Sequence, residues 1–221
     1  MIKKESNINL LDAKYFAGHS LGEYSALATS GSLDFTNAIK LLNQRGKAMQ
    51  TAVANGTGGM IAVLGVNINE INNLLKENQN DYKCYIANDN SNGQTVLSGL
   101  NTDIDKLAIF LKEKKIKNIK LPVSAPFHCK LMNKATSIMT DKIKNTNFVK
   151  PKNVIISNVT GSGTQEIEEI KDLLIKQIES PVRWRESVIY MIKNGVTNFI
   201  EIGPGKVLSG LVKRIDKTVK V

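Results

Sequence analysis

A serine at position 20 lies in a pattern that could make it a nucleophile. The residues Gly-His-Ser-Leu-Gly at positions 18–22 fit G-x-S-x-G, between an expected strand over 14–19 and an expected helix over 21–29. The two glycines permit a tight turn that raises the hydroxyl above a sheet, and the helix N-terminus supplies N–H groups to a developing oxyanion. The pattern favours nucleophilic catalysis by Ser20, although a glycine-rich structural turn would fit the same residues.

A serine hydroxyl needs a base at neutral pH, and the chain has two histidines. His19 adjoins Ser20, and adjacent side chains on a turn tend to diverge, so it is the weaker candidate. His128 follows an expected strand, in a loop where open α/β sheets build their sites. Its orienting group could be a backbone carbonyl. Spacing alone leaves open a surface histidine or one whose hydrogen bonds are satisfied in the core.

Arg45 lies on the apolar stripe of an expected helix that begins at Asp34, four residues after Leu41 and four before Met49. A guanidinium that faces inward needs an anion. The anion could be internal, such as Glu23, or the side chain could extend to solvent. The functional interpretation is bidentate capture of a substrate carboxylate, for which lysine is a poor substitute. Only four of the thirty basic residues are arginines, so an arginine at this position favours capture of a substrate carboxylate.

The order of expected elements divides the chain into two units. A central unit over 55–125 reads as the βαββαβ order of a ferredoxin-like fold. The outer segments, 1–54 and 126–221, alternate strands and helices as a parallel α/β sheet does. In the central unit we expect strands at 60–65, 83–88, 94–98 and 116–123, with helices at 69–77 and 102–114. After residue 126 we expect helices at 130–144, 166–178 and 182–193, strands at 153–158 and 198–202, and a closing helix. A cleft between an inserted unit and the larger α/β unit would be the natural place for a site.

Several short motifs occur in a fixed order from about Tyr15 to the C-terminus. They are Gly-His-Ser-Leu-Gly-Glu-Tyr at 18–24, Arg-Gly-Lys-Ala-Met-Gln at 45–50, Pro-Phe-His at 126–128, Gln177 ahead of Ser-Pro-Val-Arg-Trp at 180–184, and Glu-Ile-Gly-Pro-Gly-Lys-Val-Leu at 201–208. Together they resemble the malonyl-CoA:acyl carrier protein transacylase family. The resemblance implies a hydrolase-like parallel-sheet acyltransferase core with a ferredoxin-like insertion.

The resemblance implies catalytic roles for four residues. Ser20 would carry the malonyl ester, and His128 would be its base. The main-chain carbonyl of Gln177 would orient the histidine in place of an acid, and Leu21 would offer one oxyanion N–H. The implied reaction is ping-pong: the serine takes the malonyl group from malonyl-CoA, and the phosphopantetheine thiol of acyl carrier protein then receives it, in fatty acid biosynthesis. No cofactor is implied, because malonyl-CoA is a substrate.

The resemblance also implies residues that bind the substrate. Arg45 would clamp the free malonyl carboxylate. Asn88 and Asn90, expected on the loop after a strand of the central unit, match family positions near the cleft. Phe127 is bulky beside the base, and in related polyketide acyltransferases an aromatic residue there accompanies malonyl rather than methylmalonyl.

One departure from the family concerns the start of the chain. Only nineteen residues precede Ser20, whereas the family begins with a strand, a Gly-Gln-Gly-Ser-Gln loop and further helices. That loop supplies the other oxyanion donor, and loss of one donor typically costs about 10²–10³ in rate. The absent strand would leave an unpaired sheet edge. We therefore expect a fragment with weak stability and reduced activity.

Other functions stay open. A serine hydrolase or thioesterase could use the same turn with water as the acceptor, but it gives no reason for an inward Arg45. A non-catalytic remnant could bind only coenzyme A or carrier protein. Cys129 is a poor alternative nucleophile, since it directly follows the candidate base and lacks the glycine turn.

Composition narrows the partners and the compartment. The 221 residues carry thirty basic and twenty acidic side chains, a net charge of +10, which suits an acidic carrier protein and the phosphates of coenzyme A. The lysines are dispersed and no arginine-rich stretch occurs, so we expect no nucleic-acid partner. No apolar run approaches the ~20 residues of a membrane span, and polar residues interrupt Met1–Leu11, so we expect neither a membrane protein nor a secretory signal. Cys84 and Cys129 have neither a CxxC spacing nor partners for a zinc site, which suits a reducing compartment and argues against disulfides and metals. We expect a cytoplasmic protein, and separately we expect a monomer.

Overall fold

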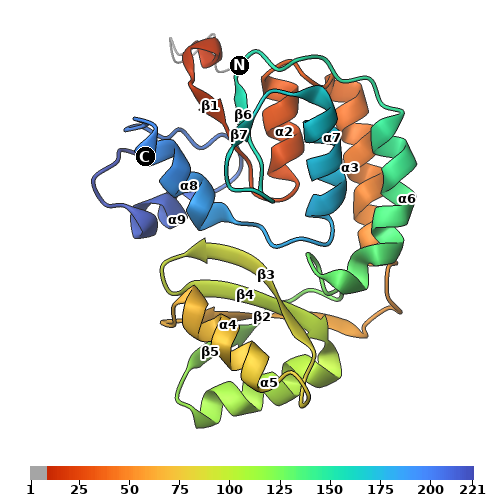
Figure 1. Ribbon diagram of the computed structural model, residues 1–221, viewed down its shortest axis with the longest axis vertical. Helices are drawn as coiled ribbons and strands as arrows, with labels where there is room; N and C mark the ends of the chain where they lie inside the picture. Colours follow the sequence, from red (N-terminus) through yellow and green to blue (C-terminus); the bar gives the residue numbers. More distant parts are fainter. Residues whose placement is uncertain (1–8) are drawn as a thin grey trace.

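The structure, a computed structural model, describes residues 9–221, and these form two groups of elements around two separate sheets (Figure 1). We predicted from the sequence that Met1–Leu11 is not a secretory signal. Residues 1–8 of that segment lie outside the described residues. None of the helices in the described part of the chain is both long and apolar enough to cross a membrane. The fold is mixed α/β.

The first sheet has three short strands in the order β1-β6-β7. Strand β1 (Tyr15–Phe16) pairs in parallel with β6 (Val154–Ile156), and β7 (Gly163–Thr164) pairs antiparallel with β6. The parallel sheet expected for the outer segments is therefore found in the β1–β6 pair, whereas β7 was not expected and reverses direction after a tight connection.

Six α-helices flank this sheet in two sets (Figure 1). On one side lie α2 (Gly22–Thr29), α3 (Phe35–Gln50), α6 (Asn133–Lys144) and α7 (Ile167–Gln177), and on the other lie α8 (Trp184–Lys193) and α9 (Val207–Ile215). Short 3₁₀ turns, η1 (Leu10–Asp12) and η2 (Lys130–Met132), precede β1 and α6. Successive residues of β6 serve the two cores: Ile155 packs with the first set and Ile156 with the second, as the period of two in a strand dictates.

The second sheet is antiparallel and follows the order β3-β4-β2-β5. Its strands are β2 (Gly58–Leu64), β3 (Cys84–Ser91), β4 (Gln94–Leu100) and β5 (Lys117–Lys120), and its helices are α4 (Ile68–Glu77) and α5 (Asn101–Glu113). Both helices cover one face, where residues such as Ile61, Leu97 and Leu107 are fully buried. The other face packs Met60 and Ala62 against Phe127. The expected order strand-helix-strand-strand-helix-strand is observed, while the exact unit boundaries at 54/55 and 125/126 stay a prediction.

Helix starts follow the local sequence. Asp34 Oδ1 accepts a hydrogen bond from Asn37 N at 3.0 Å and begins α3, as the sequence predicts. Asn67 Oδ1 accepts from the backbone N–H groups of Asn69 and Glu70, both at 3.0 Å, and begins α4. In α3 the buried residues Leu41, Arg45 and Met49 follow at the four-residue spacing of one helix face.

The prediction of a strand at 198–202 is wrong. Among the described residues this segment forms one isolated bridge, between Asn198 and Lys220, and it leaves the Ile200 and Ile202 side chains 62% and 53% exposed. Alternating apolar residues predict a strand only where a neighbouring strand is available to pair with them.

The loop position expected for Asn88 and Asn90 is also wrong, because β3 continues to Ser91. Both asparagines lie within the strand and are buried. The register shifts twice along β3, and Asn88 forms a further bridge with Val182 from the other group of elements. The expected strand ended at residue 88, but Asn88 pairs with Val96 of β4 on one side and with Val182 on the other, and the strand continues to Ser91.

Candidate active site

Ser20 lies on a strained turn between β1 and α2. Its φ of 53° is in the left-handed region, which residues other than glycine rarely adopt. Gly18 makes the turn possible, since a Cβ there would lie 2.0 Å from the carbonyl carbon and oxygen of Gly22. This is the geometry that a G-x-S-x-G pattern predicts, and it presents the serine at the start of α2.

His128 contacts Ser20 directly. The Ser20 Oγ lies 2.8 Å from His128 Nε2, and His128 Nδ1 lies 2.9 Å from the main-chain carbonyl oxygen of Gln177. Because a carbonyl oxygen only accepts, Nδ1 carries the proton and Nε2 is free to accept the serine proton. Burial, followed by the nearby charge of Arg45, lowers the pKa of His128 to about 3. The imidazole is therefore neutral at pH 7 and can act as a base.

Arg45 reaches the same serine from α3. Its Nη2 donates to Ser20 Oγ at 3.0 Å and to Gln177 Oε1 at 2.9 Å. The residue is only 6% exposed, as its place on the apolar stripe predicts, and its guanidinium lies 5.8 Å from the centroid of the Tyr24 ring. Its Nε is buried without a hydrogen-bond partner among the described residues.

Two residues that the sequence analysis did not place in the site connect the others. Asn158, fully buried after β6, accepts from Ser20 N at 2.7 Å and donates through Nδ2 to Gly18 O at 2.8 Å. Glu23 Oε2 accepts from Asn158 N at 3.1 Å and from Gln177 Nε2 at 2.7 Å. Glu23, considered above as an internal anion for Arg45, is thus joined to it through the Gln177 amide. The sequence signal that could have indicated Glu23 and Asn158 is their position: each is a polar residue close after the turn or after β6.

The other histidine turns to the second sheet. His19 Nε2 lies 2.9 Å from Asn90 Oδ1 on β3, and its ring centroid lies 5.8 Å from that of Trp184. His19 is therefore engaged away from the Ser20 hydroxyl, which agrees with its weaker standing as a base. Asn90 is brought to the site by this contact, whereas Asn88 touches the larger group through its backbone bridge to Val182.

The remaining predicted residues surround these contacts. Leu21 is the N-cap of α2, so its backbone lies beside Ser20 while its side chain is 59% exposed. Phe127 packs between the core of the first group and the inner face of the second sheet, next to His128. Cys129 is buried, with Sγ 3.1 Å from Pro126 O, which leaves it poorly placed as a nucleophile.

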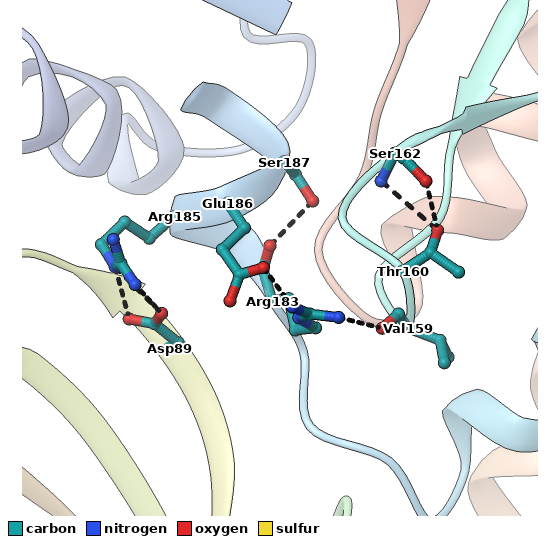
Figure 2. Close-up of polar contacts among 8 residues, drawn as sticks. All are labelled: Asp89, Val159, Thr160, Ser162, Arg183, Arg185, Glu186 and Ser187. Carbon is teal, nitrogen blue, oxygen red and sulfur yellow. Dashed lines mark hydrogen bonds and ion pairs between the residues drawn. The ribbon is translucent and has the colours of Figure 1, made fainter. Parts of the chain in front are cut away.

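A contact between Asp89 of β3 and Arg185 of α8 joins the two groups of elements (Figure 2). Arg185 Nε donates to both carboxylate oxygens of Asp89, at 3.1 and 2.9 Å, and Asp89 is only 4% exposed. On the same helix, Arg183 pairs with Glu186 and donates to Val159 O at 3.4 Å. A hollow of about 350 Å³ lies beside this contact, lined by residues of the α4 N-terminus and the β3–β4 turn together with Asp89 and Arg185.

No cluster of three or more histidine, cysteine or acidic side chains suited to a metal ion occurs among residues 9–221. The chemistry that the arrangement can perform is nucleophilic: a serine hydroxyl with a neutral imidazole on one side and a guanidinium on the other. Such a serine can accept an acyl group whose far end carries a negative charge.

Comparisons with known proteins agree with this geometry. The family model of the acyl transferase domain matches residues 11–220. The chain is 42% identical over 206 residues to the malonyl CoA-acyl carrier protein transacylase of Haemophilus influenzae, an alignment that covers 93% of this chain and 66% of that protein. This chain therefore spans slightly less than two thirds of that relative's length.

Solved structures give the same result. The acyl-carrier-protein-S-malonyltransferase of Bartonella henselae superposes with a TM-score of 0.94 at 38% identity, covering 99% of this chain and 70% of that one. A malonyl-transacylase solved in complex with a type II PKS acyl-carrier protein superposes with a TM-score of 0.93 at 36% identity, covering 99% and 70%.

Proposed function

Because the chain belongs to the acyl transferase family, we propose that it transfers a malonyl group from malonyl-CoA to the phosphopantetheine thiol of an acyl carrier protein, in fatty acid biosynthesis. The observation that carries the proposal is the position of Ser20 Oγ, 2.8 Å from His128 Nε2 and 3.0 Å from Arg45 Nη2. A base and a fixed cation at one hydroxyl suit an acyl group that bears a carboxylate.

In the first half-reaction, Ser20 Oγ attacks the thioester carbonyl of malonyl-CoA while His128 Nε2 takes the hydroxyl proton. The Gln177 carbonyl, bonded to Nδ1, stabilises the imidazolium that forms. The Leu21 N–H, at the start of α2, donates to the tetrahedral oxyanion. When the intermediate collapses, the carbon–sulfur bond breaks, the histidine returns its proton to the sulfur, and coenzyme A leaves the malonyl-serine ester.

The second half-reaction reverses these steps with a new thiol. The carrier protein's phosphopantetheine sulfur loses its proton to His128 and attacks the malonyl-serine carbonyl. The ester bond breaks, and Ser20 regains its proton from the imidazolium. One thioester replaces another, so the reaction needs no cofactor, and the site has only to lower the barrier and exclude water.

Arg45 would bind the malonyl carboxylate. Its Nη2 lies 3.0 Å from Ser20 Oγ, so the guanidinium lies beside the oxygen that would carry the acyl group. A fork of N–H groups matches a carboxylate in a way that lysine cannot. Phe127, beside His128, would disfavour the extra methyl of methylmalonyl, and Asn88 and Asn90 would line the side of the site that β3 forms.

The finer fold assignment belongs to the same proposal. The strand order β3-β4-β2-β5 with α4 and α5 on one face supports a ferredoxin-like unit inserted into a hydrolase-like core. The net charge of +10 supports an acidic carrier protein as the partner, with the chain acting as a monomer. Two free, buried cysteines suit the reducing cytoplasm.

Intact-mass spectrometry of the chain mixed with malonyl-CoA tests the proposal. We expect a malonyl adduct that is absent in Ser20→Ala and that moves to holo-acyl carrier protein when this is added. Rapid release of free malonate without transfer would instead indicate a hydrolase. No adduct at any malonyl-CoA concentration would indicate a protein that only binds coenzyme A or carrier protein, and would overturn the proposal.

A further inference from the structure

Glu23 is a buried carboxylate that the mechanism above does not use. It lies in the first turn of α2, three residues after Ser20, and is only 2% exposed. Burial raises its pKa to about 7, against the opposing effects of hydrogen bonds from Asn158 and Gln177 and of the charge of Arg45. A carboxylate in such a place is costly unless its hydrogen bonds are made, so its partners indicate its role.

The contacts of Glu23 fix the orientation of one amide. Glu23 Oε2 accepts from Gln177 Nε2 at 2.7 Å, and the same Nε2 donates to Ser20 O at 3.1 Å. A primary amide can present either its oxygen or its NH₂ group to a neighbour, but the Ser20 carbonyl only accepts, and Glu23 Oε2 already accepts from Asn158 N at 3.1 Å. The NH₂ group of Gln177 must therefore face Glu23 and the Ser20 carbonyl.

The orientation of this amide fixes the guanidinium in turn. With Nε2 facing Glu23, Gln177 Oε1 faces Arg45 and accepts from Nη2 at 2.9 Å. The same Nη2 lies 3.0 Å from Ser20 Oγ. If the amide were reversed, the Gln177 NH₂ group would face the Arg45 guanidinium, donor against donor. The guanidinium would then lose the acceptor that Gln177 provides. The chain of contacts thus runs from Glu23 through the Gln177 amide to the cation beside the nucleophile.

This chain is separate from the contact that orients the base. His128 Nδ1 donates to the main-chain carbonyl of Gln177, which belongs to the last turn of α7 and does not depend on the side-chain amide. One residue therefore serves the base with its backbone and the cation with its side chain. Loss of the Glu23 carboxylate should affect the cation and spare the base.

We propose that Glu23 is a positioning residue for Arg45: through the Gln177 amide it directs the guanidinium toward the free carboxylate of the acyl group, and so sets the preference for carboxylate-bearing over uncharged acyl thioesters. The inference rests on the proposed function and deepens it. Glu23 does not touch the substrate, and its effect is on selectivity rather than on the bond-making step.

The test measures the rates at which malonyl-CoA and acetyl-CoA acylate Ser20, followed by intact mass. In Glu23→Leu we expect the malonyl-to-acetyl rate ratio to fall about tenfold or more, with little change in the acetyl rate. Glu23→Gln keeps an acceptor oxygen for the Gln177 amide, so it should restore most of the ratio. A merely structural role would lower both rates together.

Two further variants separate selectivity from folding. Leu27→Ala, on the same helix and fully buried in the core, should lower the melting temperature and leave the ratio unchanged. Gln177→Met keeps the backbone carbonyl that His128 uses and removes only the amide. It should lower the ratio as Glu23→Leu does, and Glu23→Leu added to it should change the ratio no further. If Glu23→Leu does not fold, Gln177→Met still tests whether the amide sets the ratio.

The outcomes distinguish the two proposals. If the wild-type chain is acylated by neither thioester, the proposed function fails, and this inference fails with it. If the wild type prefers malonyl-CoA and both Glu23→Leu and Gln177→Met keep that preference, the inference alone is wrong.

Discussion

The two groups of elements solve different problems with the same chain. The antiparallel sheet, β2 to β5, has strands of up to eight residues, and it contributes a side-chain contact to the Ser20 turn, from Asn90 to His19. The β1-β6-β7 sheet has strands of two or three residues, and the side chains of the candidate active site come from the segments around it. In this molecule the long, regularly paired strands form a scaffold, whereas the side chains of the candidate active site come mainly from turns and helices outside the sheets.

A second difference lies in how polar groups are used. Near Ser20, buried polar side chains contact one another across long separations, and each hydrogen bond orients a group that takes part in the proposed reaction. At the β3–α8 contact, Asp89 and Arg185 form a bidentate pair that joins two elements (Figure 2). The first network should therefore govern rate and selectivity, and the second should govern stability.

The largest expected effect separates the two histidines. His128→Ala removes the base and should lower the rate of Ser20 acylation by about 10³-fold or more, because catalytic residues that act with a nucleophile contribute on this scale. His19→Ala, which removes the contact with Asn90, should cost less than about tenfold. The measurement is the acylation rate by rapid-quench mass spectrometry. Equal losses in both variants would contradict the assignment of His128 as the base.

The next effect concerns the cation. Arg45→Ala should shift the malonyl-to-acetyl acylation ratio toward acetyl by about 10²-fold, as expected for removal of one partner from a desolvated charge pair. Arg214→Ala is the control, since Arg214 lies on α9 and donates to Gln94 on β4. An unchanged ratio in Arg45→Ala would remove the clamp assignment.

The β3–α8 contact should respond in stability. Asp89→Asn leaves Arg185 partly buried without its charge partner and should lower the free energy of unfolding by about 2 kcal/mol. Arg183→Leu breaks the more exposed pair with Glu186 and should cost about 0–1 kcal/mol. Urea denaturation measures both variants. A larger loss in Arg183→Leu than in Asp89→Asn would contradict the assignment of the Asp89–Arg185 pair as the stabilising contact.

The smallest expected effect is that of pH on the reactivity of Ser20, which should hardly change over the range in which an ordinary histidine titrates. The His128 pKa is lowered to about 3, so the base stays neutral well below pH 6.5. Labelling of Ser20 by an uncharged sulfonyl fluoride should therefore vary less than about threefold between roughly pH 7.5 and 5.5. A steep fall with a midpoint near pH 6.5 would show an ordinary, exposed imidazole.

The same shift has a consequence for stability. Because the folded-state pKa of His128 lies below its ordinary value of 6.5, its contribution to stability is present above pH 6.5 and is lost as the pH falls toward 3. Glu23 acts in the opposite sense. Its folded-state pKa is raised from 4.5 to about 7, so its contribution is present below pH 4.5 and is lost as the pH rises through 7.

Local patterns predicted the parts of the site that are set by neighbours in the chain. The G-x-S-x-G turn and the inward face of Arg45 follow from glycines and helical spacing that lie within a few residues. The Glu23–Gln177 contact joins residues 154 positions apart, and the Glu23–Asn158 contact spans 135. No periodicity indicates such partners. The resemblance to known enzymes pointed to Gln177, but only for its backbone.

The errors in the elements have a similar origin. The 198–202 segment is rich in the apolar residues that favour a strand, yet pairing depends on a neighbour that the local sequence does not contain. Asn88 and Asn90 have the composition of a loop, yet β4 and Val182 pair with the backbone around them. A segment's own residues give its preference, and distant segments decide whether that preference is met.

The backbone of Ser20 sets activity against thermal resistance. A non-glycine residue at a φ of 53° costs about 1 kcal/mol or more, and the fold meets that cost only to raise one hydroxyl. Ser20→Gly relieves the torsion and deletes the hydroxyl in a single step. If Ser20 is the nucleophile that we propose, selection for heat tolerance alone would favour a protein without that activity, and the strained torsion would persist only while turnover is under selection.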